Sequence, residues 1–145
     1  MISIGSDHAG FQYKEQLKQL LDELGQKFED RGTMSAESVD YPDYGHRVAL
    51  DVSAGTADRG ILICGTGIGM SIVANKHRAV RAAVCESATA ARLARAHNNA
   101  NVLCFGARII GWEVAADVVR TFLSTPFEGQ RHTRRIEKIH SLTGE

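Results

Sequence analysis

Short apolar runs alternate with longer amphipathic segments along the chain. The runs are rich in isoleucine, valine, leucine and alanine, and glycine or polar residues bound them, which is typical of buried strands. The five predicted strands are Ile2 to Ser6, Gln26 to Asp30, Gly60 to Cys64, Arg81 to Cys85 and Val102 to Phe105. Because a segment long enough for a crossover helix separates each strand from the next, we expect a parallel sheet.

Apolar residues with helical spacing fill the first two of these intervening segments. Leu17, Leu20, Leu21 and Leu24 recur at separations of three, four and seven residues, and Gly25 is placed to end the helix. After the second strand comes a polar stretch over residues 31–43, followed by a predicted helix that turns its valines, Val48 and Val52, toward the core.

The second half of the chain has the same alternation. Further helices are predicted over about Ser87 to His97, Gly111 to Ser124 and Arg131 to Leu142. In the last of these, the tail helix, Ile136 and Ile139 are spaced, together with Leu142, to pack along one side. The sequence therefore predicts a three-layer α/β/α, Rossmann-like domain over residues 1–145 with a five-stranded parallel sheet.

Most of the candidate functional residues come directly after a predicted strand. Right-handed crossovers place the carboxyl ends of all parallel strands at one edge of the sheet, where ligands bind. Candidate groups follow the first, third and fifth strands, in Ser6-Asp7-His8-Ala9-Gly10, Cys64-Gly65-Thr66-Gly67 and Gly106-Ala107-Arg108. We expect four further residues to join this edge, two at the end of the helix predicted over about Ser87 to His97 and two on one face of the tail helix: His97, Asn98, Arg131 and Arg135.

The turn after the third strand carries the strongest functional signal. Gly65, Gly67 and Gly69 alternate behind Cys64, and such glycines let backbone N–H groups converge on a charged oxygen at the start of a helix. A thiol in such a turn is favoured as a thiolate and is suited to act as a base. The other two cysteines lie in or beside strands and are expected to be buried structural residues: Cys85 and Cys104.

The other candidates each have a structural interpretation as well. Asp7 is a good N-cap for the first helix, and His97 is suited to the C-terminus of its helix as a cation. The tail arginines are typical of a solvated helix face. A thiol, a carboxylate, two histidines and an arginine pair together nevertheless favour a site, and two arginines on one helix face suit a phosphate.

Charge and cysteine content restrict the partners. The chain has 17 Lys and Arg residues against 17 Asp and Glu residues, so its charge indicates neither nucleic acid nor a membrane surface, and a small ligand is favoured. The three cysteines are an odd number, which fits reduced thiols in the cytoplasm better than a disulfide framework. Neither an export signal nor a membrane-spanning run is recognisable.

The sequence lacks the motifs of dinucleotide, nucleotide-phosphate and zinc sites. Met70 occupies the position of the third glycine in a dinucleotide fingerprint, and no Gly-Lys-Ser or Gly-Lys-Thr follows the glycines as it would in a P-loop. The six histidines lack the spacings of zinc sites. We therefore expect chemistry without a metal or other cofactor.

The chain resembles the type B ribose-5-phosphate isomerases, a family that includes allose-6-phosphate and galactose-6-phosphate isomerases. The resemblance runs nearly end to end. It rests on Gly5-Ser6-Asp7-His8-Ala9-Gly10, Asp40-Tyr41-Pro42, Gly60 to Gly69, Ala74-Asn75-Lys76, His97-Asn98, Asn101-Val102-Leu103, Phe105-Gly106-Ala107-Arg108 and Gly129-Gln130-Arg131-His132. Some members use a glutamate a few residues after the cysteine position as base, but Ile68 cannot titrate, so Cys64 assigns this chain to the thiol branch.

The resemblance implies interconversion of an aldose phosphate and a ketose phosphate through a cis-enediolate, without a cofactor. In this scheme Cys64 moves the proton between C2 and C1, and Asp7 carries hydroxyl protons. His97 and Thr66 open the furanose ring. The residues at positions that bind the substrate are Thr66 and the amides of Gly65, Gly67 and Gly69 at the enediolate oxygen, His8, Arg108, Arg131 and Arg135 at the phosphate, and Tyr41 and Asn98 at the sugar.

Family resemblance also implies a homodimer or a homotetramer whose sites are completed across the interface, with His97 and Arg108 acting on the partner's Cys64. Two alternatives remain open. An isomerase for a hexose phosphate, such as allose 6-phosphate or galactose 6-phosphate, would use the same chemistry. A non-catalytic sugar-phosphate sensor would retain the arginines and the glycine turn but lack turnover.

Overall fold

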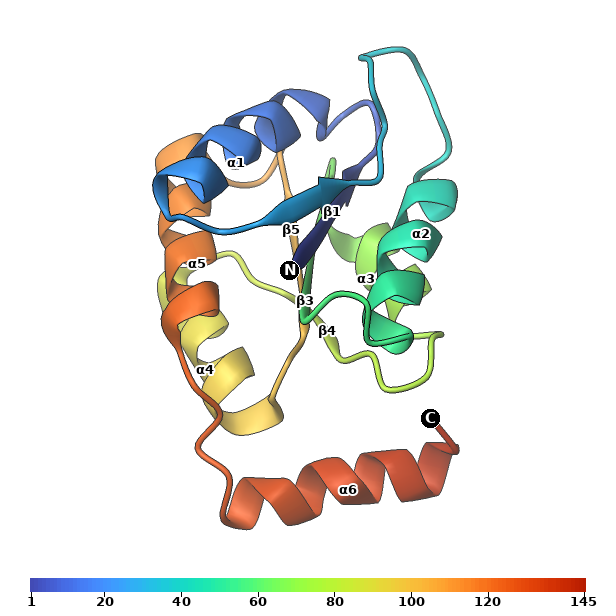
Figure 1. Ribbon diagram of the computed structural model, residues 1–145, viewed down its shortest axis with the longest axis vertical. Coiled ribbons are helices and arrows are strands. Elements are labelled where there is room, and N and C mark those ends of the chain that lie inside the picture. The colour runs from blue at the N-terminus through green and yellow to red at the C-terminus, as the bar shows by residue number, and fades with distance from the viewer.

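Five parallel strands form the centre of the computed structural model, which describes residues 1–145. They lie in the order β2-β1-β3-β5-β4 (Figure 1). The strands are β1 (Ile2–Ser6), β2 (Phe28–Asp30), β3 (Arg59–Cys64), β4 (Ala82–Val84) and β5 (Val102–Gly106). The helices are α1 (Phe11–Glu23), α2 (Tyr41–Ser53), α3 (Ile68–Ala74), α4 (Ala88–Asn98), α5 (Trp112–Ser124) and α6 (Arg131–Thr143). The predicted strand set and fold class are confirmed.

Two strands are shorter than predicted because neighbouring turns use their backbone donors. The N–H of Gln26 donates to the carbonyl of Leu21 and closes the end of α1, where Gly25 has φ +69°, so β2 begins only at Phe28. The N–H of Arg81 donates to the side chain of Asn101 rather than to a neighbouring strand. A helix ending with a left-handed glycine commonly consumes such donors.

The polar stretch after β2 is also shorter than predicted. It was expected to reach Asp43, but α2 already begins at Tyr41 and has Pro42 in its first turn. Proline is favoured there because its fixed φ suits a helix and its missing N–H would have no helical partner. Tyr41 therefore stands at the start of a helix, next to the carboxyl end of the sheet.

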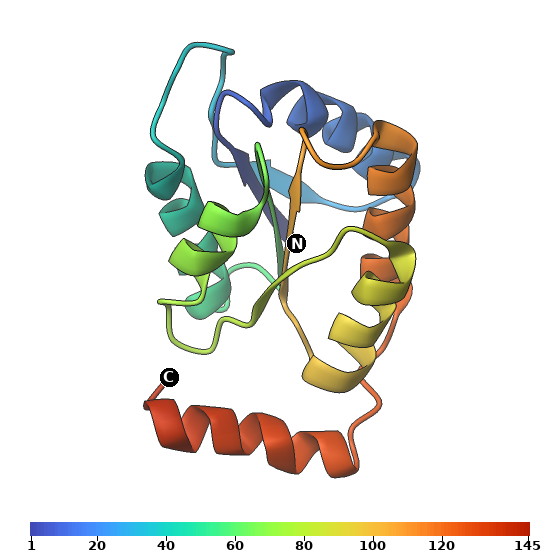
Figure 2. The same cartoon turned by 180° about the vertical axis from the view of Figure 1, so that it is seen from behind.

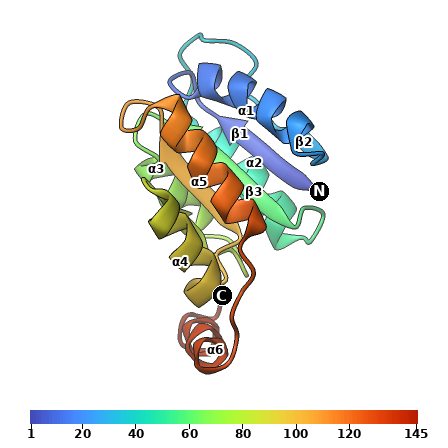
Figure 3. The same cartoon turned by 90° about the vertical axis from the view of Figure 1, so that its left-hand side faces the viewer.

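Helices cover both faces of the sheet (Figure 3). One core cluster joins α1, α4 and α5 to residues such as Ile61 and Ile63, and the other joins α2 and α3 to Leu62 and Cys64. Successive residues of β3 thus point to opposite layers, as strand geometry requires. Because both faces are covered, the strands read as continuous apolar runs.

The tail helix α6 buries fewer of its apolar side chains than its sequence predicts. It runs across the end of the sheet at which the strands begin (Figures 1 and 2). Ile136 is buried, but Ile139 is 47% exposed and Leu142 is 76% exposed. The expectation that all three pack along one side is wrong within a single chain, because α6 extends beyond the body of the domain. None of the helices is both long enough and apolar enough to cross a membrane.

Close backbone contacts at the carboxyl edge require glycine. Gly67 has φ +81°, and a Cβ atom there would lie 2.8 Å from the backbone of Phe105. A Cβ at Gly106 would lie 2.5 Å from Thr66 Cα, and one at Gly10 would lie 2.5 Å from the carbonyl oxygen of Ile63. The turn after β1 therefore touches the end of β3, and the turn after β3 touches the end of β5, in both cases through backbone atoms.

We expect Gly67→Ala to lower the free energy of unfolding by about 2 kcal/mol or more, since it adds both a left-handed alanine and a backbone clash. Urea unfolding at 25 °C measures this. Gly111→Ser is the matched control, because Gly111 has φ −72° at the start of α5 and open space around its Cα. Serine is a good N-cap, so this control should lower the free energy of unfolding by less than about 0.5 kcal/mol. Equal losses in both variants would contradict the contact argument.

Candidate active site

The thiol of Cys64 lies at the point where β3 turns into α3. The residue is only 5% exposed, and the N–H of Gly67 donates to its Sγ at 3.0 Å. The N–H of Ile68 donates to Oγ1 of Thr66 at 3.2 Å, so the hydroxyl caps the start of α3. A backbone N–H aimed at sulfur at a helix start stabilises negative charge on the sulfur.

The turn after β5 holds Arg108 beside this thiol. The N–H of Ala107 donates to the carbonyl of Cys64 at 2.9 Å, and the N–H of Arg108 donates to the carbonyl of Gly65 at 3.0 Å. The Arg108 guanidinium packs on the Cα of Gly65. Arg108 therefore lies beside the Cys64 turn of its own chain, because β5 lies next to β3 in the same sheet. Its expected action on the Cys64 of a partner stays a prediction.

The turn after β1 brings Asp7 and His8 to the same edge. Oδ1 of Asp7 accepts a hydrogen bond from the N–H of Gly10 at 3.0 Å, so this carboxylate stabilises the turn before α1 and leaves Oδ2 for a ligand. The N-cap of α1 is Gly10 and not Asp7. Nδ1 of His8 accepts a hydrogen bond from the N–H of Val39 at 3.1 Å. The proton of the neutral His8 ring is thus assigned to Nε2, which can donate to a ligand.

Tyr41 completes this group from the first turn of α2. A Cβ atom at Gly69 would lie 2.6 Å from the ring carbons of Tyr41, so the ring rests directly on the glycine-rich turn. We call the six side chains at this end of the sheet the carboxyl-edge group: Asp7, His8, Tyr41, Cys64, Thr66 and Arg108. The five of them that follow strands lie at the carboxyl edge as predicted, and Tyr41 joins them from α2. Their roles in binding and catalysis stay predictions.

The remaining four candidates lie at the opposite end of the sheet, which corrects the expectation of one common edge. A crossover helix starts at the carboxyl edge and runs back toward the start of the next strand, so α4 ends at the amino edge with His97 and Asn98. The start of α6 lies below the end of α4 (Figure 2). The first turns of α6 carry Arg131 and Arg135. We call His97, Asn98, Arg131 and Arg135 the amino-edge group.

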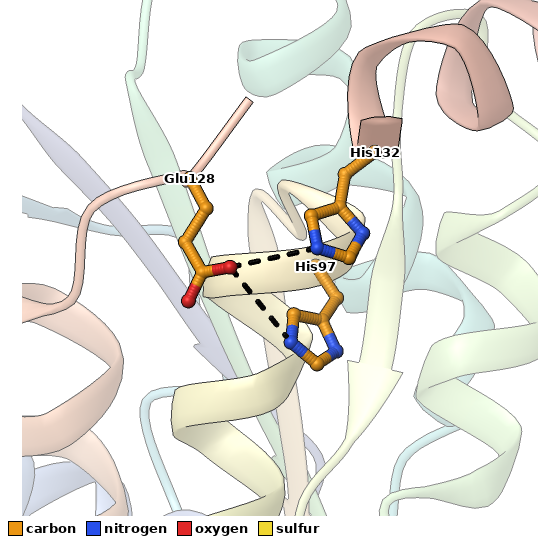
Figure 4. A group of neighbouring side chains, drawn as sticks. All are labelled: His97, Glu128 and His132. Atoms are coloured by element: carbon orange, nitrogen blue, oxygen red, sulfur yellow. Dashed lines mark ion pairs between the residues drawn. The ribbon is translucent and has the colours of Figure 1, made fainter. Parts of the chain in front are cut away.

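A cluster that the sequence did not indicate surrounds His97 (Figure 4). The rings of His97 and His132 stack with centroids 4.4 Å apart and planes 13° from parallel. Oε2 of Glu128 lies 3.5 Å from Nε2 of His132 and 4.0 Å from Nε2 of His97. The four-residue separation of Glu128 and His132 was a usable signal, but His97 joins them only through the fold.

The chain resembles known proteins over almost its whole length. The profile of the Ribose/Galactose Isomerase family matches residues 2–139. The chain belongs to the ribose/galactose isomerase family. It is 47% identical to ribose-5-phosphate isomerase B of Escherichia coli over 97% of this chain and 95% of that protein.

Two solved structures extend this similarity to the fold of the ribose/galactose isomerase family. That of Clostridium thermocellum ribose-5-phosphate isomerase B has a TM-score of 0.97 and 48% identity, and it covers 99% of this chain and 97% of the other. That of a Thermotoga maritima ribose 5-phosphate isomerase has a TM-score of 0.93 and 56% identity, with 97% of each chain covered.

The other thiols of this ribose/galactose isomerase family member are structural, as predicted. Burial raises the pKa of Cys85 to about 11. Burial also raises the pKa of Cys104 well above its ordinary value. Cys85 packs in one core cluster and Cys104 in the other, so both remain neutral packing residues.

The buried ring of His132 makes the stability of this family member depend on pH. Burial first, and then the charge of Arg131, lower the pKa of His132. Just below the ordinary histidine pKa of about 6.5, the unfolded chain therefore binds a proton that the folded chain does not, so stability falls as pH falls. We expect the Tm to drop more between about pH 7 and about pH 5 in the unsubstituted chain than in His132→Gln. Calorimetry measures this, and equal drops would contradict it.

Proposed function

We propose that this protein interconverts ribose 5-phosphate and ribulose 5-phosphate, with Cys64 as the base. The observation that carries the proposal is a buried thiol that accepts a backbone N–H in a glycine turn, in a chain similar along its whole length to a protein named ribose-5-phosphate isomerase B. A sulfur held in this way next to a sugar carbon suits proton abstraction.

The reaction moves two protons and needs no redox partner. Cys64 takes the proton from C2 of the open-chain aldose and returns it to C1, while a hydroxyl proton moves from O2 to O1 with Asp7 as its carrier. The charge of the cis-enediolate develops on oxygen. Amides of Gly65 and Gly69 with the Thr66 hydroxyl would stabilise it, while the N–H of Gly67 is directed at the sulfur of Cys64. One such oxyanion donor is worth roughly 3 to 4 kcal/mol.

The substrate would be held by its phosphate and its sugar hydroxyls. Arg108 and His8 supply donors at the carboxyl edge, where Tyr41 also faces the sugar. Arg131 and Arg135 lie four residues apart on α6, so both guanidinium groups can approach one phosphate, with Asn98 near them. These residues provide binding energy, whereas Cys64 acts on the transition state.

We propose that two copies of the chain build each site. The carboxyl-edge and amino-edge groups lie at opposite ends of one chain, so a single chain cannot place both on a small sugar phosphate. A two-fold dimer would bring the amino-edge group of one copy to the Cys64 of the other. Exposed apolar side chains on α3 and α6 support such an interface: Ile68, Ile72, Ile139 and Leu142.

Two broader assignments belong to the same proposal. Residues 1–145 would act as a single catalytic domain, because both core clusters share the one sheet. All three cysteines are free, which suits a reducing compartment, and we place the enzyme in the cytoplasm.

We expect metal-free protein to turn over ribose 5-phosphate faster than allose 6-phosphate or galactose 6-phosphate. Cys64→Ala should lower kcat by about 100-fold or more with little change in KM, because it removes a base and no phosphate contact. Cys85→Ala is the matched control and should keep its activity.

A faster turnover of a hexose phosphate would mean that the enzyme acts on that sugar rather than on ribose 5-phosphate. Binding without turnover would favour a sensor, and an active Cys64→Ala variant would refute the base assignment.

Mixing two inactive variants tests the shared site. Random pairing of Cys64→Ala chains with His97→Ala chains makes half of all dimers mixed, and each mixed dimer has one complete site out of two. We therefore expect about a quarter of the original turnover after mixing, unfolding and refolding. Variants that stay inactive together while each still dimerises would show that one chain builds its whole site.

A further inference from the structure

The side chain of Glu128 faces two imidazoles at once (Figure 4). Its Oε2 is 3.5 Å from Nε2 of His132 and 4.0 Å from Nε2 of His97. The Nε2 atom of His132 is buried and has no hydrogen-bond partner, so the Glu128 carboxylate is the charged group that it faces. The cluster therefore has a carboxylate placed to accept N–H groups that would otherwise lack a partner.

The backbone holds Glu128 at this position. Its N–H donates to the carbonyl of Ala96 at 3.0 Å, one residue before His97. The N–H of His132 donates to the carbonyl of Gly129 at 3.1 Å, and two residues with positive φ, Gly129 and Gln130, turn the chain between them. The carboxylate thus reaches His97 from a turn that is bonded to the same helix.

A metal ion fits this cluster poorly, although two histidines and a glutamate are common ligands. A metal must lie in the plane of each imidazole, along the lone pair of its nitrogen. Two rings only 13° from parallel direct their lone pairs side by side, so the lone pairs do not converge. The cations Arg131 and Arg135 next to His132 also oppose a further positive charge. The geometry favours hydrogen bonding over coordination.

The stacked ring of His132 and the carboxylate of Glu128 together set the orientation of the His97 ring and the nitrogen that carries its proton. His132 is 5% exposed, so it is a fixed surface against which the His97 ring lies. The carboxylate faces Nε2 of His97, and a carboxylate partner holds the proton of a neutral imidazole on the nitrogen that it faces. That leaves Nδ1 as the nitrogen with a free lone pair. The 4.0 Å separation exceeds a hydrogen bond, and such contacts often shorten when substrate binds.

We propose that Glu128 is a positioning residue for His97 in the opening of the furanose ring, and that it acts by keeping the ring proton on Nε2. This inference rests on the proposed function. Neutral His97 takes the proton of O1 at its Nδ1 and returns it to O4. The C1–O4 bond breaks with its electron pair staying on O4, and the C1=O1 bond forms, so no proton or electron is gained or lost.

Ring opening can be separated from enolisation by the choice of substrate. Ribose 5-phosphate is mostly a closed furanose. Ribulose 5-phosphate cannot form a furanose, because the phosphate blocks O5. Exchange of its C1 proton with solvent deuterium therefore requires Cys64 and the phosphate contacts but no ring opening. Glu128 should matter for the first substrate and not for this exchange.

The test compares Glu128→Gln with Glu137→Gln, which removes the same charge from an exposed position on α6. We expect Glu128→Gln to lower kcat/KM for ribose 5-phosphate by about 10- to 100-fold, a part of the roughly 100- to 10,000-fold that a placed acid or base contributes. Deuterium exchange into ribulose 5-phosphate should change less than about twofold in the same variant. Glu137→Gln should change neither rate. Nitrogen-15 chemical shifts of His97 should report the loss of the Nε2–H tautomer in Glu128→Gln alone.

Three results would overturn the inference. Glu128→Gln could keep full turnover of ribose 5-phosphate, which would show that His97 needs no carboxylate. The rates of ribose 5-phosphate turnover and of deuterium exchange could fall by the same factor, which would show that Glu128 has a structural or phosphate-binding role. The His97 tautomer could stay unchanged. If the unsubstituted protein catalyses neither reaction, the proposed function itself fails, and that outcome is distinct from the other three.

Discussion

The close contact between the turns after β3 and β5 is the constraint on which the carboxyl edge depends. Gly67 and Gly106 meet the neighbouring backbone at distances that exclude any side chain. This contact directs the N–H of Gly67 at the sulfur of Cys64 and ties Arg108 to the carbonyl of Gly65. The same few atoms therefore set the orientation of the thiol, the start of α3 and the position of a cation. Conformational freedom is low where the proposed chemistry requires fixed geometry.

Parallel topology explains why the candidate residues fall into two groups. Residues that follow a strand lie at the carboxyl edge, and residues that end a crossover helix lie at the amino edge. His97 and Asn98 end α4, and α6 continues across that same end of the molecule. One chain therefore carries both groups of candidate residues without joining them, which is why we propose a site shared between two chains. The exposed apolar residues of α3 and α6 are consistent with a second chain that covers them.

Much of this arrangement could be predicted from the sequence. The five strands, the thiol in the glycine turn and the neighbourhood of Asp7 and His8 all follow from local patterns, because short-range chemistry and strand order determine them. The position of His97 was predicted wrongly because we placed the end of its helix at the carboxyl edge, where the strands end. A crossover helix ends at the amino edge instead. Exposure of Ile139 and Leu142 was missed because periodicity shows which side of a helix is apolar and cannot show what covers it. The stack of His97 on His132 depends on contacts between α4 and α6, which no spacing in the sequence reveals.

A crystal structure with a phosphorylated hydroxamate, a stable mimic of the cis-enediolate, tests the central claim most directly. We expect one inhibitor at each Cys64, with Sγ about 3 to 3.5 Å from the carbon that stands for C1 or C2. Its phosphate should contact Arg131 and Arg135 of a second copy, and His97 of that copy should face the sugar end. An inhibitor bound away from Cys64, or held entirely by residues of one chain, would contradict the account.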